Sequence, residues 1–205
     1  MSAVPVPRPT TIISGGQTGA DFGALIAAEQ LGIETAGYAP LGYLTDDGPM
    51  PLLAEYKIKE APTADWAARD ILNVEMCDGL IAFLFNVPMT GRGTEKTINC
   101  VATGRHEQGR EWGPIYQGST LGNTYQTIDV AADPAKPDSK PKSIIIIYDL
   151  APQNVELVAR DIRTFLRTRS VTKLMISGPC QRTFLETPGI NVEQLVKSVL
   201  IKVFA

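Results

Sequence analysis

Residues 14–21, SGGQTGAD, bring glycines, hydroxyl groups, an amide and one carboxylate together where a strand should become a helix. Glycine lets the backbone approach a ligand without a clash from a Cβ atom, and free N–H groups at a helix start attract phosphate. The stretch lacks the lysine of a P-loop and differs from the dinucleotide motif G-x-G-x-x-G. A tight turn that binds nothing is the alternative. We predict a phosphate-binding loop with ligand contacts from Gly15, Gly16, Gln17, Thr18 and Gly19.

Asp21 closes this loop and allows two interpretations. An acid in the first turn of a helix is stabilised by the helix dipole whether or not it has a function. If the side chain faces the site instead, its carboxylate can accept hydrogen bonds from a ribose hydroxyl or from a ring N–H. The sequence leaves both interpretations open, and Asp21 is therefore a candidate ligand-binding residue.

A second glycine loop, TGRGTEKT at residues 90–97, opens a later helix. Gly91 and Gly93 permit close approach of a ligand, and Thr94 can cap the helix. Arg92 offers a planar, bidentate donor for an oxyanion, although an exposed loop arginine is the alternative. Glu95 is a first-turn acid, for which a structural role is at least as well supported as a functional one. We predict that this loop contributes to the same ligand site.

The composition limits the classes of function. The 205-residue chain has a net charge of −3 and therefore no overall basic field that would hold a nucleic-acid backbone. His106 is the only histidine, and the three cysteines are far apart without a C-x-x-C pair, which argues against a catalytic triad, a zinc site and a disulfide framework. We expect neither a metal site nor a nucleic-acid partner.

The first ten residues are rich in proline, and no run of the sequence is apolar enough for a secretory leader or a membrane span. We therefore expect a cytoplasmic protein without a membrane partner. The length favours one domain over residues 1–205. Residues 105–142, rich in Gly, Pro, Gln and Lys, are expected to form an insertion that could contain a hairpin of its own.

The elements that must position the two loops follow from the periodicity of the apolar residues. Short β-branched or continuously apolar runs predict strands, and segments that begin with a capping residue or a glycine loop predict helices. The strands are expected near residues 10–14, 33–38, 56–60, 79–85, 143–148 and 173–177, and the helices near 19–31 and 63–77 and from about 94, 154 and 191 onwards.

This alternation predicts an α/β fold, a Rossmann-like three-layer sandwich with a mostly parallel sheet of about six strands and helices on both faces. In the common strand order 3-2-1-4-5-6, strands one and four are neighbours at the switch point where ligands bind. These are the two strands followed by glycine loops. We therefore expect the two loops to face the same ligand.

Several motifs in this order resemble the putative molybdenum cofactor carrier family. They are GGQTGAD after strand one, ARDILNVEMCDGLIAF at residues 68–83, the G-x-G-T loop and the closing ISGP…TPGI. The family shares its Rossmann-like superfamily with cytokinin-activating phosphoribohydrolases and nucleotide sensors. The resemblance covers residues 11–104 and 143–203. It implies that Arg69 and Asn73, which match the R-T-x-x-N-V stretch of the carriers with Asp70 in place of the threonine, belong to the site with the two glycine loops.

The sequence also departs from these relatives. The phosphoribohydrolase signature G-G-x-G-T-x-x-E ends in a catalytic acid, and Thr97 occupies that position here. Glu95 lies about 200° away around a helix and cannot replace that acid. The loop at residues 40–43 lacks the lysine and arginine of the carriers, and Cys180 stands where they have an arginine, with Arg182 nearby as a possible replacement. The departures favour binding over hydrolysis.

We therefore expect a homo-oligomeric protein, a dimer or tetramer, that holds a phosphate-bearing small molecule without transforming it. The resemblance implies the molybdenum cofactor or a nucleotide as the ligand, with Arg69 or Arg92 as the counter-charge. One alternative is a nucleotide N-glycosidase that uses Glu95 or Asp21 as its acid. Another is a nucleotide sensor in signalling, in which the insertion and the helical arginines Arg160, Arg163 and Arg167 contact a partner.

Overall fold

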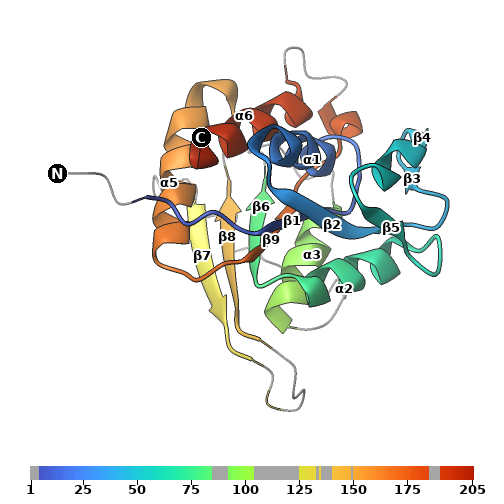
Figure 1. Ribbon diagram of the computed structural model, residues 1–205, viewed down its shortest axis with the longest axis horizontal. Coiled ribbons are helices and arrows are strands. Elements are labelled where there is room, and N and C mark those ends of the chain that lie inside the picture. Colours follow the sequence, from blue (N-terminus) through green and yellow to red (C-terminus); the bar gives the residue numbers. More distant parts are fainter. Residues whose placement is uncertain are drawn as a thin grey trace.

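The computed structural model is built around a seven-stranded sheet with the strand order β5-β2-β1-β9-β6-β8-β7 (Figure 1). The structure describes residues 5–84, 92–103, 125–132, 134, 140–148, 150–184 and 190–205. The strands are β1 (Thr11–Ile13), β2 (Glu34–Ala39), β5 (Ile58–Glu60), β6 (Gly79–Phe83), β7 (Tyr125–Val130), β8 (Lys142–Ile147) and β9 (Lys173–Ser177). Neighbouring strands pair in parallel except β7 with β8. The predicted α/β sandwich with a mostly parallel sheet is confirmed.

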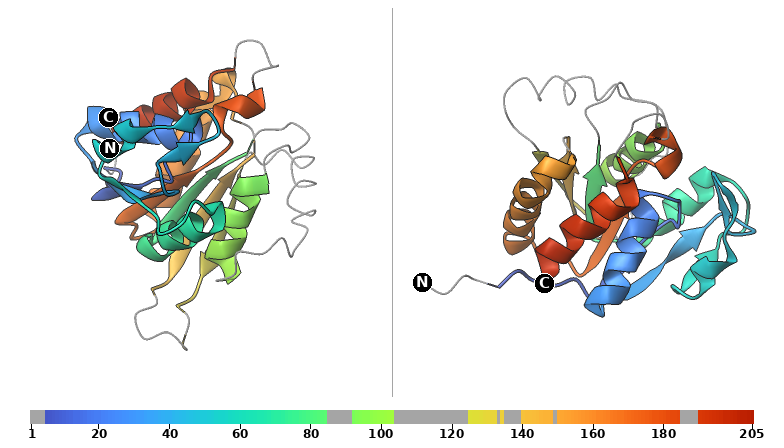
Figure 2. Two further views of the ribbon diagram at one scale, coloured as in Figure 1. Left: turned by 90° about the vertical axis from the view of Figure 1, so that its right-hand side faces the viewer. Right: turned by 90° about the horizontal axis from the view of Figure 1, so that it is seen from above.

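Helices cover both faces of the sheet (Figure 2). One face packs against α1 (Ala20–Leu31), α5 (Val155–Arg167) and α6 (Val192–Phe204), and the other against α2 (Trp66–Met76) and α3 (Arg92–Thr103). In β8, Ile145 and Ile147 belong to the first core, and Ile144 and Ile146 to the second. This alternation has the period of two that is expected of a strand buried on both faces. Each fully buried isoleucine contributes about 2 kcal/mol to the stability of the fold.

The expected strand order is wrong at its centre. The last strand, β9, lies between β1 and β6 and pairs with both, so the two strands with glycine loops are not neighbours. The sequence pattern could not determine this order, because all three strands are buried runs that fit any central position. The consequence is that the loop after β9, and not only the first glycine loop and the start of α3, lies at this edge of the sheet.

Part of the predicted insertion adds a strand to the sheet. Residues Tyr125–Val130 form β7, which pairs antiparallel with β8 and covers the edge of that strand. The strand is only partly buried, and its mixed polar and apolar residues lack the apolar run that predicts a strand. Residues 104–124 and 135–139, which include His106, lie outside the described part of the chain.

A small hairpin of β3 (Leu44–Thr45) and β4 (Gly48–Pro49) follows β2, and the short helix η1 (Pro51–Ala54) comes next. The helix α2 begins later than expected, because Asp65 and not Thr63 is its N-cap: the Asp65 carboxylate accepts a hydrogen bond from the Ala67 N–H at 3.0 Å. None of the helices in the described residues is long and apolar enough to cross a membrane.

Candidate functional site

A cavity of about 640 Å³ opens at the carboxyl end of β9, among the N-terminal turns of three helices. Its volume lies within the range of small-molecule sites. Its lining comes from α1 and the preceding loop, the β3–β4 hairpin, α2, α3, and β9 with its following loop. These residues are Gln17, Asp21, Asp46, Asp65, Trp66, Ala67, Arg69, Asp70, Gly93, Thr94, Lys96, Thr97, Met175, Ser177, Gly178, Pro179 and Cys180.

A buried ionic cluster forms one wall of the cavity. Arg69 Nη1 donates to Asp21 Oδ2 at 3.3 Å, and Arg69 Nε lies 3.2 Å from Asp70 Oδ1. Each of the three residues is less than one-tenth exposed. The contact with Asp70 is an ion pair without hydrogen-bond alignment, so Nε has no hydrogen-bond acceptor among the described residues. The charge of Arg69 is thus already shared with two carboxyl groups of the protein.

Gly15 makes room for Arg69 and not for a ligand in this conformation. A Cβ atom on Gly15 would lie 1.3 Å from Arg69 Nη1 and 2.9 Å from Asp21 Oδ2. The guanidinium therefore lies directly against the backbone of the first glycine loop. On its other side, Arg69 Cζ is 5.5 Å from the centre of the Trp66 ring, a cation–π contact.

Asp21 lines the cavity from the first turn of α1. Burial raises the pKa of its carboxyl group, and the nearby Arg69 charge and the Gln17 N–H oppose that rise. The two interpretations of Asp21 thus overlap: it is a first-turn acid, and it faces the site. A carboxyl group with a raised pKa in a cavity is a candidate proton donor.

The N–H groups of the first glycine loop are largely used within the protein. Ser14 Oγ accepts from Gly16 (3.1 Å), Asp21 from Gln17 (3.3 Å), Gln17 Oε1 from Thr18 (2.9 Å) and the Pro179 carbonyl from Ala20 (3.2 Å). The loop therefore closes on its own side chains and on the loop after β9. A phosphate bound here would have to displace some of these hydrogen bonds.

Gln17 and Arg182 fix the main chain of Asp46 at the hairpin tip. Gln17 Oε1 accepts a hydrogen bond from the Asp46 N–H at 3.0 Å. Arg182, in the short helix η4 (Gln181–Phe184), donates from Nη1 to the Asp46 carbonyl oxygen at 3.0 Å. The backbone is thus held from both sides while the exposed Asp46 side chain lines the cavity.

The start of α3 forms the opposite wall, with Gly93, Thr94, Lys96 and Thr97. The Thr97 hydroxyl donates to the Gly93 carbonyl at 3.2 Å. Glu95 is half-buried and not among the lining residues. Gly91 lies outside the described residues, as does the side chain of Arg92, whose backbone begins α3.

Asn73 holds α2 against the sheet. Its Oδ1 accepts from the Tyr38 N–H at 2.8 Å, and its Nδ2 donates to the Tyr38 carbonyl at 3.0 Å. The side chain is completely buried and is not part of the cavity lining. The structure therefore brings Arg69 to the first glycine loop but turns Asn73 towards β2.

Residues 12–108 match the family model described as the circularly permutated YpsA SLOG family. A crystal structure of a putative molybdenum carrier protein from Syntrophus aciditrophicus superposes with a TM-score of 0.63 at 26% sequence identity. The match covers 97% of this chain and 96% of the other. The predicted resemblance to the molybdenum carriers is confirmed. No curated protein matches the chain.

The cavity also contains residues that were not predicted from the sequence, among them Asp46, Trp66 and Lys96. Trp66 could have been found, because it lies three residues before Arg69 and therefore on the same face of a helix. Asp46 could not, because its place at the cavity depends on the folding of the hairpin. Among the described residues, no group of three or more His, Cys, Asp or Glu side chains could hold a metal ion.

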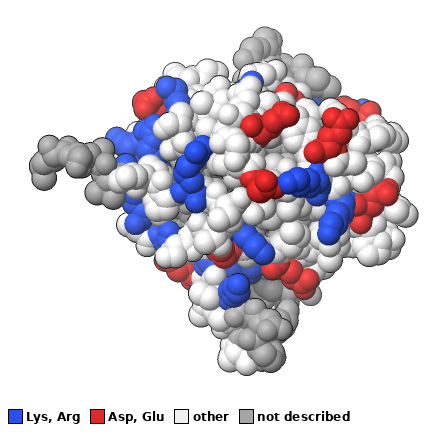
Figure 3. Space-filling view, viewed as in Figure 1, with Lys and Arg blue, Asp and Glu red and all other residues white. Residues whose placement is uncertain are grey.

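The arginines of α5 have contacts within the chain. Arg160 pairs with Asp161 at 3.0 Å, Arg163 with Glu156 at 3.7 Å, and Arg167 also has an interaction partner. On the face seen in Figure 3, basic side chains gather towards the left, and basic and acidic side chains are mixed towards the right. These contacts are typical of a solvated helix surface.

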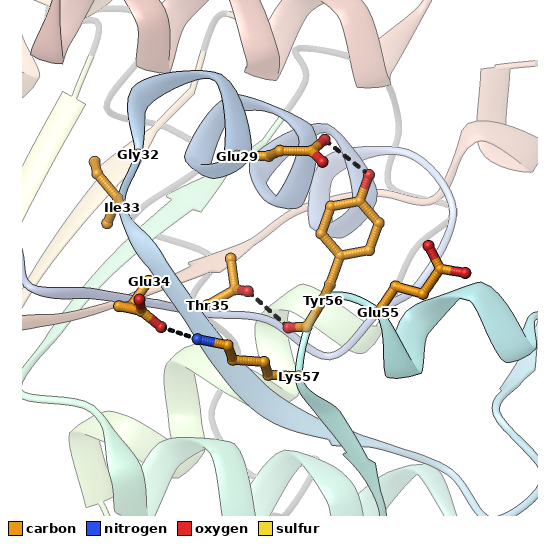
Figure 4. A pocket seen from close by; sticks show the side chains of 8 residues that line it. All are labelled: Glu29, Gly32, Ile33, Glu34, Thr35, Glu55, Tyr56 and Lys57. Carbon is orange, nitrogen blue, oxygen red and sulfur yellow. Dashed lines mark hydrogen bonds and ion pairs between the residues drawn. The ribbon is translucent and has the colours of Figure 1, made fainter.

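A second, smaller pocket of about 260 Å³ is lined by the end of α1, the start of β2 and residues 55–57 (Figure 4), and none of the described residues predicted for the site lines it. The Tyr56 hydroxyl donates to Glu29 at 3.3 Å, and Lys57 pairs with Glu34 at its rim. Burial and the nearby Glu29 carboxylate raise the pKa of Tyr56. These polar groups contact one another.

Proposed function

We propose that the protein binds a phosphate-bearing small molecule in the 640 Å³ cavity and holds it without chemistry. The observation that carries the proposal is the cavity itself, a polar space into which the N-terminal turns of α1, α2 and α3 project. Helix N-termini carry partial positive charge and N–H groups without helical acceptors, both of which favour an anion. The name of the neighbour from Syntrophus aciditrophicus supports a carrier role.

Within this proposal, the phosphate lies at the start of α3 and not in the first glycine loop. The amides of the first loop are occupied, and the charge of Arg69 is compensated by Asp21 and Asp70. Among the described lining residues, α3 contributes the cation Lys96 and no carboxylate. The ligand would therefore place its anionic end against α3.

The molybdenum cofactor and nucleotides are the two ligand classes that we propose. Both carry a phosphate and a polar ring, and the lining supplies groups for each: α3 for the phosphate, and the aspartates with Trp66 for the ring. The pterin and its metal would supply the redox chemistry of a recipient enzyme, and the chain's own residues would only bind and orient the cofactor. A cytoplasmic homo-oligomer is part of the same proposal.

A binding assay with matched variants tests the proposal. We expect molybdopterin, a nucleoside monophosphate or ADP-ribose to raise the melting temperature, since a ligand at 100 times its Kd adds about 2.7 kcal/mol. The variant Lys96→Ala should weaken binding, and the exposed Lys59→Ala on β5, outside the cavity, should not. The proposal is wrong if no phosphate-bearing compound stabilises the protein.

Catalysis by Asp21 is the second candidate, favoured by the raised pKa of this cavity-lining acid. Thr97 lines the cavity at the position that the catalytic acid holds in the phosphoribohydrolase signature. Its hydroxyl donates a hydrogen bond to the Gly93 carbonyl, and a hydroxyl cannot act as a general acid near neutral pH. If the protein is an N-glycosidase, nucleoside monophosphates will release free base, and Asp21→Asn will abolish that release. Intact nucleotide recovered after long incubation would exclude this function for the substrates tried.

A further inference from the structure

The charged groups of the cavity are segregated. Four aspartates and one arginine line it on the side of α1, the hairpin and α2, namely Asp21, Asp46, Asp65, Asp70 and Arg69. On the side of α3, the described lining residues contribute Lys96 and two threonine hydroxyls. Because carboxylates accept hydrogen bonds and do not donate them, the first side suits a ligand surface rich in N–H groups. The second side suits an anion.

Asp46 is the carboxylate best placed to accept hydrogen bonds from a ligand surface rich in N–H groups. Asp21 and Asp70 are buried against Arg69, and Asp65 caps α2. The Asp46 main chain is held at both its N–H and its carbonyl, by Gln17 and Arg182, so its position does not depend on a ligand. With the main chain held, only the side-chain torsions of Asp46 must be ordered for its carboxylate to accept two parallel N–H···O bonds.

Trp66 provides a flat surface in the same cavity. Trp66 is 38% exposed, an unusual feature for tryptophan, and Arg69 Cζ lies 5.5 Å from the ring centre. Tryptophan backed by a cation is a favourable stacking surface for a heteroaromatic ring. The ring of a ligand stacked here would present its edge within the acidic half of the cavity.

We propose that Asp46 and Trp66 determine ligand specificity, and that they select a planar ring with an N–H and an exocyclic amino group side by side. This inference rests on the proposed function, and it adds the ring chemistry and the orientation: the ring lies on Trp66 with its donor edge at Asp46, and the phosphate lies at α3. Guanine nucleotides and pterins share this edge. Hypoxanthine has the ring N–H without the amino group, and adenine lacks that N–H.

The test compares the affinities of GMP, IMP, AMP and ribose 5-phosphate by isothermal titration calorimetry. We expect GMP to bind about tenfold or more tightly than IMP and AMP, the usual discrimination by a bidentate contact. Asp46→Asn should remove this preference without changing the affinity for ribose 5-phosphate. Asp47→Asn, an exposed carboxylate of the same hairpin outside the cavity lining, is the matched control and should keep the preference.

Variants of Trp66 test the stacking surface. Trp66→Leu should weaken GMP about tenfold, and Trp66→Phe should restore most of the affinity because the aromatic face is kept. Ile71→Ala, an equally exposed apolar residue of α2 outside the cavity, should have no effect. Dihydroneopterin monophosphate is measured in parallel. If this compound binds and GMP does not, and if Asp46→Asn weakens its binding, the ring that the site selects is a pterin.

Equal affinities for GMP, IMP and AMP, without binding of the pterin, would overturn this inference and leave the proposed function standing. The same holds if Asp46→Asn weakens ribose 5-phosphate as much as it weakens GMP. Failure of every phosphate compound to bind would overturn the proposed function together with the inference.

Discussion

The two glycine loops look alike in the sequence but differ in what their glycines accommodate. In the first loop, Gly15 makes room for a buried arginine, and Gly19 makes room for the chain after β9. In the second, a Cβ atom on Gly93 would have no neighbour within 4 Å among the described residues. The first loop is thus a packing junction, and the second leaves space beside the cavity. A glycine motif alone therefore does not distinguish a loop that binds a ligand from one that contacts its own protein.

The largest effect should come from removing the cation of the junction. Arg69→Met would leave Asp21 and Asp70 buried without their counter-charge, which costs about 3–5 kcal/mol. Urea unfolding measures the loss. Lys96→Met at the second loop is the matched change and should leave the free energy of unfolding nearly unaltered. Similar losses in the two variants would contradict the difference between the loops.

Replacing Gly19 or Gly93 by alanine should give a smaller but clear difference in stability. Gly19 has a φ of +94°, and its Cβ would lie 2.6 Å from the Gln181 nitrogen and 2.7 Å from the Pro179 oxygen, so Gly19→Ala should destabilise by about 3 kcal/mol. Gly93→Ala should lie within about 0.5 kcal/mol of the wild type. Thermal unfolding compares them. A destabilised Gly93→Ala would show that the second loop is packed as tightly as the first.

The smallest effect concerns pH. Because burial raises the pKa of Asp21 above its ordinary value of 3.8, the folded state keeps this proton where the unfolded chain has lost it. The free energy of unfolding should therefore fall as the pH rises from the ordinary to the raised pKa. Asp21→Asn lacks this titration, so its stability relative to wild type should increase across that interval.

Urea unfolding between pH 4 and pH 8 measures this difference, with Asp47→Asn as an exposed control. A relative stability of Asp21→Asn that decreases with pH would mean that Arg69, and not burial, dominates the environment of Asp21.

Much of the fold could be predicted because its strands are continuous apolar runs. Residues 79–83 and 143–147 are typical of buried parallel strands, and both lie inside the sheet with a strand on either side. The strand order could not be predicted, since β9 is equally apolar and fits several central positions. Arg69 was identified through the resemblance to the carriers. Trp66 was missed, although its spacing of three residues from Arg69 on a helix could have indicated it. Asp46 was missed because a hairpin aspartate has no periodic pattern that would place it at a site.

The sequence by itself determined the α/β class, the order of the elements along the chain and the presence of polar glycine loops after β1 and β6. These features depend on local periodicity and on turn chemistry, which each segment carries in its own residues. Only the tertiary structure decided that β9 separates those strands, that Arg69 fills the space beside Gly15, and that Asp46 lies at the cavity. These features depend on contacts between segments far apart in the chain, such as Gln17 and Arg182 with the hairpin.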